Sequence, residues 1–163
     1  MALTKTAKID IGISEDNRQA IANILNHLLA DEFVLYTKTR KFHWNVKGIH
    51  FHDLHLFFES QYKELAEIMD EVAERIRKIG HYSLGTLQQF LDETNLLEHT
   101  DDGSSAEVMI EALLEDHETI IRELRKAIDP IQEKHKDAGT ADFLTGLMEQ
   151  HESMAWMLRS MLQ

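Results

Sequence analysis

The amino-acid sequence predicts an all-α protein built as a four-helix bundle. The chain of 163 residues contains one proline and seven glycines, and so few helix breakers favour long helices over a turn-rich β fold. Four long stretches also repeat apolar residues every three to four positions, which is the period of an amphipathic helix. Because hydrophobic residues make up 43% of the sequence, we expect a single domain over residues 1–163, with a short tail at 1–13.

The first predicted helix runs from about Asp16 to Phe42. Ser14 is its expected N-cap, because a serine side chain can accept a hydrogen bond from a free amide of the first turn. Glu15 and Asp16 suit the positive end of the helix dipole. The apolar positions of this helix recur at spacings of three and four: Ile21, Ile24, Leu25, Leu28, Leu29 and Phe33.

The second predicted helix runs from about His50 to Ile79. Gly80 follows it as a residue able to adopt the left-handed conformation that ends many helices. The helix presents one apolar stripe: Leu54, Phe57, Phe58, Leu65, Ile68, Met69, Val72 and Ile76.

The third predicted helix runs from about Ala106 to Asp129. Ser104 and Glu107 have the spacing of a capping box, in which each side chain bonds the other residue's amide. Pro130 is expected to end or bend this helix, because proline lacks an amide hydrogen.

The fourth predicted helix runs from about Ala141 to Leu162, with Thr140 as its expected N-cap. Between the second and third helices lies a long connection, Gly80 to Gly103, with a short helical pattern from Leu87 to Leu91. A connection of this length predicts a crossover, which is the ferritin-like topology rather than a simple up-down-up-down bundle.

The composition excludes several kinds of function. The sequence has no cysteine, which excludes disulfides, zinc–thiolate sites, iron–sulfur clusters and thiol catalysis. No run of about 18 apolar residues is present, and the N-terminus lacks the apolar stretch of a signal peptide. We therefore expect no membrane association and a cytoplasmic protein, with association to the nucleoid left open. The net charge of −12 predicts repulsion of nucleic acid and attraction of cations.

Residues able to bind a metal gather at the end of the first helix and along the second. His43 ends the first helix, and the second carries His55, Glu59, Asp70 and Glu74. His55 and Glu59 are four residues apart, as are Asp70 and Glu74, so each pair shares one helix face. Glu59 and Asp70, however, lie about 16 Å apart along the axis. One chain therefore cannot close a site whose metal–ligand bonds are about 2 Å long.

A second copy of the chain could close such a site. Positions 55 and 74 have the same midpoint as positions 59 and 70. A two-fold axis near Glu64 and Leu65 would therefore set one half of the ligands opposite the other half. A set of two imidazoles and three carboxylates suits Fe(II), Mn(II) or Zn(II). From spacing alone the alternative, an exposed acidic face with unrelated histidines, stays open.

The same stretch resembles the signature of the Dps family, the miniferritins of the ferritin-like superfamily. The matching segments run from His43 to Gly48, from Phe51 to His55 and from Asp70 to Ile76. A looser similarity covers nearly the whole chain, including the segment from Gly139 to Asp142. The resemblance implies catalytic iron ligands in sites across a two-fold interface: His43, His55, Glu59, Asp70 and Glu74.

The resemblance also implies an activity and an assembly. Fe(II) would be oxidised to Fe(III), with hydrogen peroxide preferred over oxygen. Ferric mineral would be stored in a hollow dodecamer, which would protect the cell from oxidative damage. Position 59, often Asp in the family, is Glu here, and the longer side chain could change the occupancy of the second iron position. Asp142 and Asp137 are implied to line an acidic three-fold pore for iron entry, with Gly139 standing where many relatives have another Asp.

Several other residues receive weaker predictions. Trp44 adjoins a predicted ligand and is expected to serve packing, with shielding of the site or uptake of an oxidising equivalent as the alternative. His50 and His52 are expected to be exposed turn residues rather than additional ligands. Five further histidines are expected at the surface or in satisfied positions: His81, His99, His117, His135 and His151.

Three other functions compete with the ferroxidase hypothesis. In a DNA-compacting stress protein iron binding would be secondary, but Lys5 and Lys8 against Asp10 give the tail little positive charge, so DNA binding should be weak or absent. A ferritin or bacterioferritin with a di-iron centre inside one subunit needs Glu-x-x-His motifs on two helices. No Glu precedes any of the ten histidines by three positions. A metal-free helical interaction module would leave the shared midpoint as coincidence.

Overall fold

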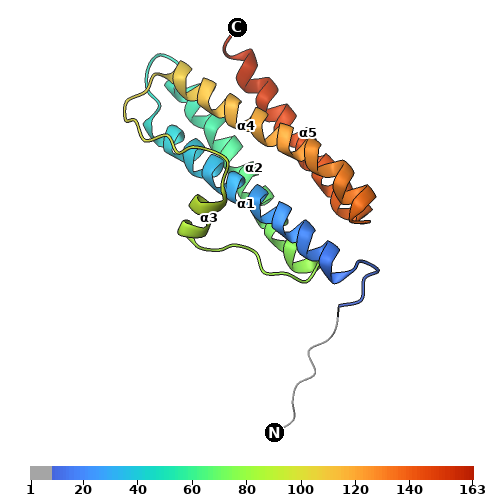
Figure 1. Ribbon diagram of the computed structural model, residues 1–163. Helices are drawn as coiled ribbons and strands as arrows, with labels where there is room; N and C mark the ends of the chain where they lie inside the picture. Colours follow the sequence, from blue (N-terminus) through green and yellow to red (C-terminus); the bar gives the residue numbers. More distant parts are fainter. Residues whose placement is uncertain (1–8) are drawn as a thin grey trace.

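The computed structural model describes residues 9–163, and all regular structure in that range is helical (Figure 1). The elements in chain order are α1 Glu15–Asn45, α2 Phe51–Lys78, α3 Leu87–Glu93, α4 Ala106–Asp129, the π-helical turn η1 Pro130–Lys134, and α5 Ala138–Ser160. The predicted four-helix bundle with a short helix in the crossover is confirmed. Within the described range no helix is both long and apolar enough to cross a membrane.

The four long helices form two antiparallel pairs. A short turn at 46–50 joins α1 to α2, and η1 with residues 135–137 joins α4 to α5. Figure 1 shows the chain returning along the bundle after α2, with α3 lying beside α1, before α4 begins. The long connection therefore crosses the length of the bundle, as the ferritin-like topology requires.

The core between the pairs is built from the apolar stripes that the sequence shows. Each long helix contributes side chains that are almost completely buried, and these interdigitate in one cluster: Leu25, Leu35, Phe42, Phe58, Leu65, Ile68, Leu113, Ile120, Leu144 and Leu158. Burial of each such side chain contributes roughly 1.5–3 kcal/mol to folding. This burial fixes which face of α1 and α2 remains outside the core and available for a site.

The C-terminal end of α2 follows the sequence prediction. The amide of Gly80 donates to the carbonyl of Arg77 at 3.0 Å, and the amide of His81 donates to the carbonyl of Ile76 at 3.1 Å. Gly80 has φ of +95°, a conformation that glycine adopts without a steric penalty. These two bonds are the Schellman motif, and they satisfy carbonyls that the helix end leaves free.

Two predicted N-caps are wrong by a few residues. The cap of α4 is Ser105, which accepts from the Val108 amide at 3.3 Å, while Ser104 bonds to His99 instead. The cap of α5 is Asp137 rather than Thr140, so α5 begins three residues earlier than expected. Both errors have one cause: adjacent residues of the cap-forming type compete, and tertiary partners decide between them.

Pro130 does not end the helical path. The chain continues through η1, in which the amide of His135 donates to the Pro130 carbonyl at 3.0 Å. A wider π-type turn accommodates a residue that has no amide hydrogen and whose ring crowds the preceding turn. α4 and α5 are thereby joined through a compact connection. α1 also extends to Asn45, three residues past its predicted end, so His43 lies inside its last turn.

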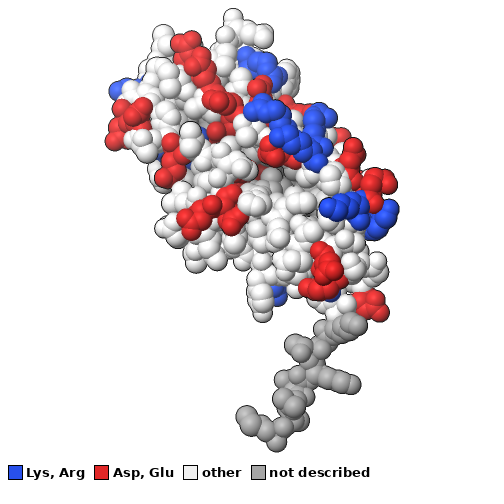
Figure 2. Space-filling model, viewed as in Figure 1, with Lys and Arg blue, Asp and Glu red and all other residues white. Residues whose placement is uncertain are grey.

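On the face shown in Figure 2, most basic side chains lie along α4 and α5, with acidic side chains among them, and acidic side chains also occur over the rest of the face. On α4 and α5, Arg125 pairs with Glu152, and Arg159 pairs with Glu118 at 2.6 Å. Such pairing leaves little uncompensated positive charge on this face of the bundle.

Candidate metal centre

His43 and His55 lie against each other where α1 ends and α2 begins. Their rings are stacked, with centroids 3.8 Å apart and planes 19° apart. Nδ1 of His43 lies 2.8 Å from the backbone carbonyl oxygen of His55, and Nδ1 of His55 lies 2.8 Å from the carbonyl oxygen of His43. Each histidine therefore binds the backbone of the other, across the turn that joins the two helices.

These reciprocal bonds determine which ring nitrogen can bind a metal. A carbonyl oxygen only accepts hydrogen bonds, so each Nδ1 must carry a hydrogen and donate it. In the neutral imidazole Nε2 then holds the lone pair. Histidines that bind metals usually have their second ring nitrogen fixed in this way by a carbonyl or carboxylate. Both rings are thus in the form that a metal ligand requires.

Glu59 lies one turn beyond His55 on α2, beside the two histidines. Its side chain is 30% exposed and is ion-paired with Lys63, four residues further along. The hydrogen bond and the charge of Lys63 hold the pKa of Glu59 below its usual range, and His43 and His55 act in the same direction. Glu59 is therefore an ionised carboxylate next to two imidazoles, which is a suitable set of ligands for Fe(II).

Asp70 and Glu74 lie on the exposed surface of the same helix, away from the first three residues. Both are solvent-accessible, and Glu74 pairs with Lys78 at 2.9 Å. Among residues 9–163 of one chain, no three histidine or acidic side chains converge closely enough to hold a metal ion. The structure thus brings His43 and His55 together. Glu59 lies one turn further along α2, and the other two predicted ligands lie about three helical turns beyond it.

An aromatic cluster surrounds the histidine pair. The ring of Tyr62 meets His43 edge-on, with centroids 5.2 Å apart, and Tyr36 meets Tyr62 edge-on at 6.1 Å. The Arg40 guanidinium lies over the rings of Tyr62 and Trp44, at 4.9 and 5.4 Å from their centroids. This cluster packs against the side of His43 and limits how far its ring can move.

Comparisons with known proteins identify the family. Residues 22–163 match the family model described as Ferritin-like domain. The chain is 41% identical over 146 residues to DNA protection during starvation protein 2 of Bacillus anthracis, covering 90% of this chain and 98% of that protein. The chain belongs to the Dps family.

Other Dps-type relatives agree over nearly the full length. An uncharacterized low temperature-induced protein of Nostoc is 46% identical over 156 residues, covering 96% of this chain and 87% of the relative. Among solved structures, DpsC from Streptomyces coelicolor superposes with a TM-score of 0.93 at 29% identity, covering 96% of this chain and 91% of that one. The Vibrio cholerae Dps, described as one of the ferritin-like diiron-carboxylate proteins, gives 0.90 at 29% identity, covering 99% and 100%.

Of the two residues predicted for a pore of the Dps shell, only one is available to a cation. Asp142 is exposed near the start of α5. Asp137 is 4% exposed, and its carboxylate accepts from the amide of Thr140 at 2.9 Å and pairs with Arg75 at 3.2 Å. Asp137 thus caps a helix and ties α2 to α5. The assignment of Asp142 to a pore remains a prediction.

Three other residues near the candidate metal centre also received predictions. His50 and His52 are exposed, as expected, although His52 lies in the first turn of α2. Trp44 was expected to serve packing, but in the single chain it is 64% exposed and lies outside the core, with the Arg40 guanidinium over its ring. The sequence reasoning missed Lys63, Arg40 and Tyr62. Lys63 and Lys78 each follow a predicted carboxylate ligand by four residues, and this spacing could have indicated the two ion pairs.

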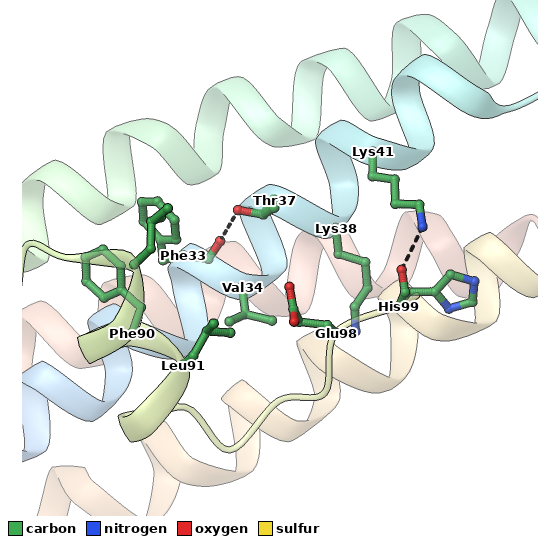
Figure 3. A pocket seen from close by; sticks show the side chains of 10 residues that line it. Phe33, Val34, Thr37, Lys38, Lys41, Phe90, Leu91, Glu98 and His99 are labelled. Carbon is green, nitrogen blue, oxygen red and sulfur yellow. Dashed lines mark hydrogen bonds between the residues drawn. The ribbon is translucent and has the colours of Figure 1, made fainter. Parts of the chain in front are cut away.

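A pocket between α1 and α3 lies on another side of α1 (Figure 3). Phe33, Val34, Phe90 and Leu91 give it an apolar lining, and Lys41 donates to the backbone carbonyl of His99 at 2.9 Å. This bond fastens the crossover connection to the end of α1, two residues before His43. Among the described residues, the lining of this pocket holds no set of metal ligands.

Proposed function

We propose that this miniferritin is a ferroxidase whose sites form between two-fold related subunits. Each site would use His43, His55 and Glu59 of one chain with Asp70 and Glu74 of a second copy. The observation that carries the proposal is the reciprocal bonding of the two histidines, which leaves both Nε2 atoms free beside an ionised carboxylate. The shared midpoint of the ligand positions supports the two-fold arrangement.

Fe(II) is the substrate of the proposed reaction, and hydrogen peroxide is the preferred oxidant. Two Fe(II) ions each lose one electron, and one peroxide molecule accepts both electrons as its O–O bond breaks. With two further waters the products are two units of ferric oxyhydroxide and four protons. Because both electrons are taken up together, no hydroxyl radical needs to leave the site, and this limits oxidative damage to the cell.

The chain's own residues would position the iron and hold its charge. The imidazoles supply neutral nitrogen ligands, and the carboxylates supply negative charge that becomes more valuable when Fe(II) turns into the harder Fe(III). Glu59 must release Lys63 before it can bind iron, because one ammonium already occupies its carboxylate. We further propose that the ferric product is stored in a hollow dodecamer in the cytoplasm, and that Asp142 lies on the route of iron entry.

The decisive experiment is anaerobic loading with Fe(II), followed by a pulse of hydrogen peroxide. Ferric absorbance should rise rapidly, and the iron should co-elute with a large assembly on size exclusion. A His43→Ala/His55→Ala variant should lose the rapid phase, whereas His52→Ala should keep it, because His52 is exposed outside the cluster. Oxidation no faster than in buffer, with iron precipitating, would overturn the proposal.

A further inference from the structure

Three side chains that can ionise are buried together in the core, away from the metal centre. Glu32 of α1, His117 of α4 and His151 of α5 are all 0% exposed. Nε2 of His151 lies 2.8 Å from Oε1 of Glu32, and Nδ1 of His151 lies 2.9 Å from Nδ1 of His117. We call these residues the core triad. Their hydrogen bonds connect three of the four long helices.

The geometry limits where protons can be in the core triad. If Glu32 is ionised, it only accepts, and Nε2 of His151 carries a hydrogen toward it; if Glu32 is protonated, it donates its hydrogen to Nε2. Only one hydrogen fits between the two facing Nδ1 atoms. If His117 supplies it, Glu32 is ionised, both rings are neutral and the triad is negative. If His151 supplies it, the triad has no net charge, either with an imidazolium beside an ionised Glu32 or with a neutral ring beside a protonated one.

The surroundings favour an arrangement with no net charge. The buried residues of α2 are apolar except for Gln61. Of the other buried charged side chains of α1 and α4, Lys38 pairs with Asp116 at 2.5 Å, and Asp31 accepts from the Asn95 amide at 2.6 Å. Among the described residues, Oε2 of Glu32 and Nε2 of His117 have no hydrogen-bond partner. Because an uncompensated charge inside such a core costs several kcal/mol, the hydrogen between the two rings comes from His151, and His117 is neutral with its own hydrogen on Nε2.

We propose that the core triad is an acid-sensitive lock on the bundle, which holds α4 against α5 while His117 is neutral and releases them when His117 takes up a proton. A protonated His117 presents an N–H toward the N–H of His151 across 2.9 Å, so their hydrogen bond is lost. The core triad then carries one positive charge that none of its own groups compensates.

The direction of the pH dependence follows from the folded state. Burial, and then the charge of His151, hold the pKa of His117 well below its usual value of 6.5. The opened bundle therefore binds this proton more readily than the closed one. The free energy by which the lock stabilises the closed bundle is fully present above pH 6.5. It is lost as the pH falls below 6.5 toward the lower pKa that His117 has in the folded state.

Hydrogen exchange of the assembled protein tests this proposal. The opening constant of α4 and α5 amides, corrected for intrinsic exchange, should rise as the pH falls from 7.5 to 5. The variant His117→Gln keeps a hydrogen-bonding group at this position that does not titrate. Its opening constant should depend less steeply on pH than that of the wild type, by about one proton, or up to tenfold per pH unit. His135→Gln, at a buried histidine outside the triad, should behave like the wild type. Equal pH dependence in His117→Gln and wild type would overturn the lock.

Ring-nitrogen NMR of histidine-labelled wild-type protein provides a test that needs no variant. At pH 7.5, His151 should carry a hydrogen on Nδ1, and His117 should be the neutral form with its hydrogen on Nε2. A His151 without a hydrogen on Nδ1, or a His117 already protonated at this pH, would contradict the proton positions that the lock requires. Neither test depends on iron oxidation, so the lock and the ferroxidase proposal can fail separately.

Discussion

His43 and His55 each donate a hydrogen bond of 2.8 Å from Nδ1 to the backbone carbonyl of the other, twelve residues away in the chain. The backbone at the α1–α2 turn thereby sets the tautomer and the orientation of both rings. In this Dps-family chain the packing of two helices therefore fixes both rings in the form that the proposed metal ligands need.

Replacing His55 with asparagine should separate metal binding from this structural role. The asparagine Nδ2 can occupy the place of Nδ1 and still donate to the His43 carbonyl, but nothing replaces Nε2. We expect Fe(II) affinity to fall by at least about tenfold while the thermal stability stays close to that of the wild type. Anaerobic titration and thermal unfolding measure the two quantities. Unchanged Fe(II) affinity would show that His55 is not a ligand.

Lys63 is expected to compete with iron for Glu59. In Lys63→Met a metal no longer has to displace an ammonium, so Fe(II) affinity should rise, on the order of a few-fold. Lys63 is the main cause of the lowered pKa of Glu59, so this pKa should rise in the variant. As the pH is lowered, protonation of Glu59 should therefore weaken Fe(II) binding at a higher pH in the variant than in the wild type. Calorimetric titration at two pH values checks both effects.

Lys126→Met is the matched control for this experiment. It removes a lysine paired with Glu123 on α4, far from the metal centre, and it changes the net charge equally. If both variants raise the affinity alike, the cause is the overall charge of the protein and not the pairing with Glu59.

Much of the fold could be predicted because it depends on local patterns. The four long helices, the crossover and the end of α2 at Gly80 follow from apolar periodicity and from the conformational freedom of glycine. The ligand residues on α1 and α2 followed from spacing and family resemblance. The sequence could predict that His43 and His55 belong to one site, but not their hydrogen bonds. Those bonds join each ring to the other residue's backbone, so they depend on how α1 and α2 pack.

The core triad shows what local patterns do not contain. His117 and His151 were expected at the surface or in satisfied positions. His151 is buried and satisfied at both ring nitrogens, whereas His117 is buried and lacks a partner at Nε2. Their contacts join residues 34 and 119 positions apart, which periodicity cannot reveal. One signal was present: Glu32 continues the spacing of Leu25 and Leu28, so an acidic residue stands at a position of the apolar stripe.

The buried ion pair between Lys38 and Asp116 should be sensitive to removal of one partner. The two side chains are 6% and 10% exposed, and Lys38→Met leaves a carboxylate in the core without its counter-charge. The free energy of unfolding should fall by about 3–5 kcal/mol at neutral pH, whereas Lys38→Met/Asp116→Leu should recover most of it. Denaturant unfolding measures both.

The pH dependence of that loss provides a further check. Burial raises the pKa of Asp116, although Lys38 opposes this effect, so the folded protein binds this proton more tightly than the unfolded chain. The destabilisation in Lys38→Met should therefore shrink as the pH falls toward about 4 and the carboxyl becomes neutral. A loss that does not change with pH would point to packing instead of charge.

Gly80→Ala should destabilise the end of α2. A Cβ at this position would lie 2.1 Å from Cδ1 of Ile9 and 2.8 Å from a guanidinium nitrogen of Arg18, and the backbone has φ of +95°. We expect a loss of more than about 1 kcal/mol in the free energy of unfolding. Gly85→Ala is the control, because its Cβ would meet no atom within 4 Å and its φ is not in the left-handed region.

DNA binding should be weak at physiological salt, although several relatives are named for DNA protection. The net charge is −12, and on α4 and α5 three basic side chains, Arg125, Lys126 and Arg159, are paired with glutamates. Lys5 and Lys8 of the tail lie outside the described residues. Phosphate contacts made by few unpaired cations contribute little affinity, and salt weakens them further.

Gel retardation of plasmid at neutral pH and about 0.15 M salt measures this directly, and no shift is expected. In Glu123→Gln/Glu152→Gln, Lys126 and Arg125 lose their partners, so retardation should begin at a higher salt concentration than for the wild type. Clear retardation of the wild type at about 0.15 M salt would contradict the prediction, and it would favour a DNA-compacting role. The double variant then locates the binding surface, because α4 and α5 contribute to it only if the variant binds more tightly.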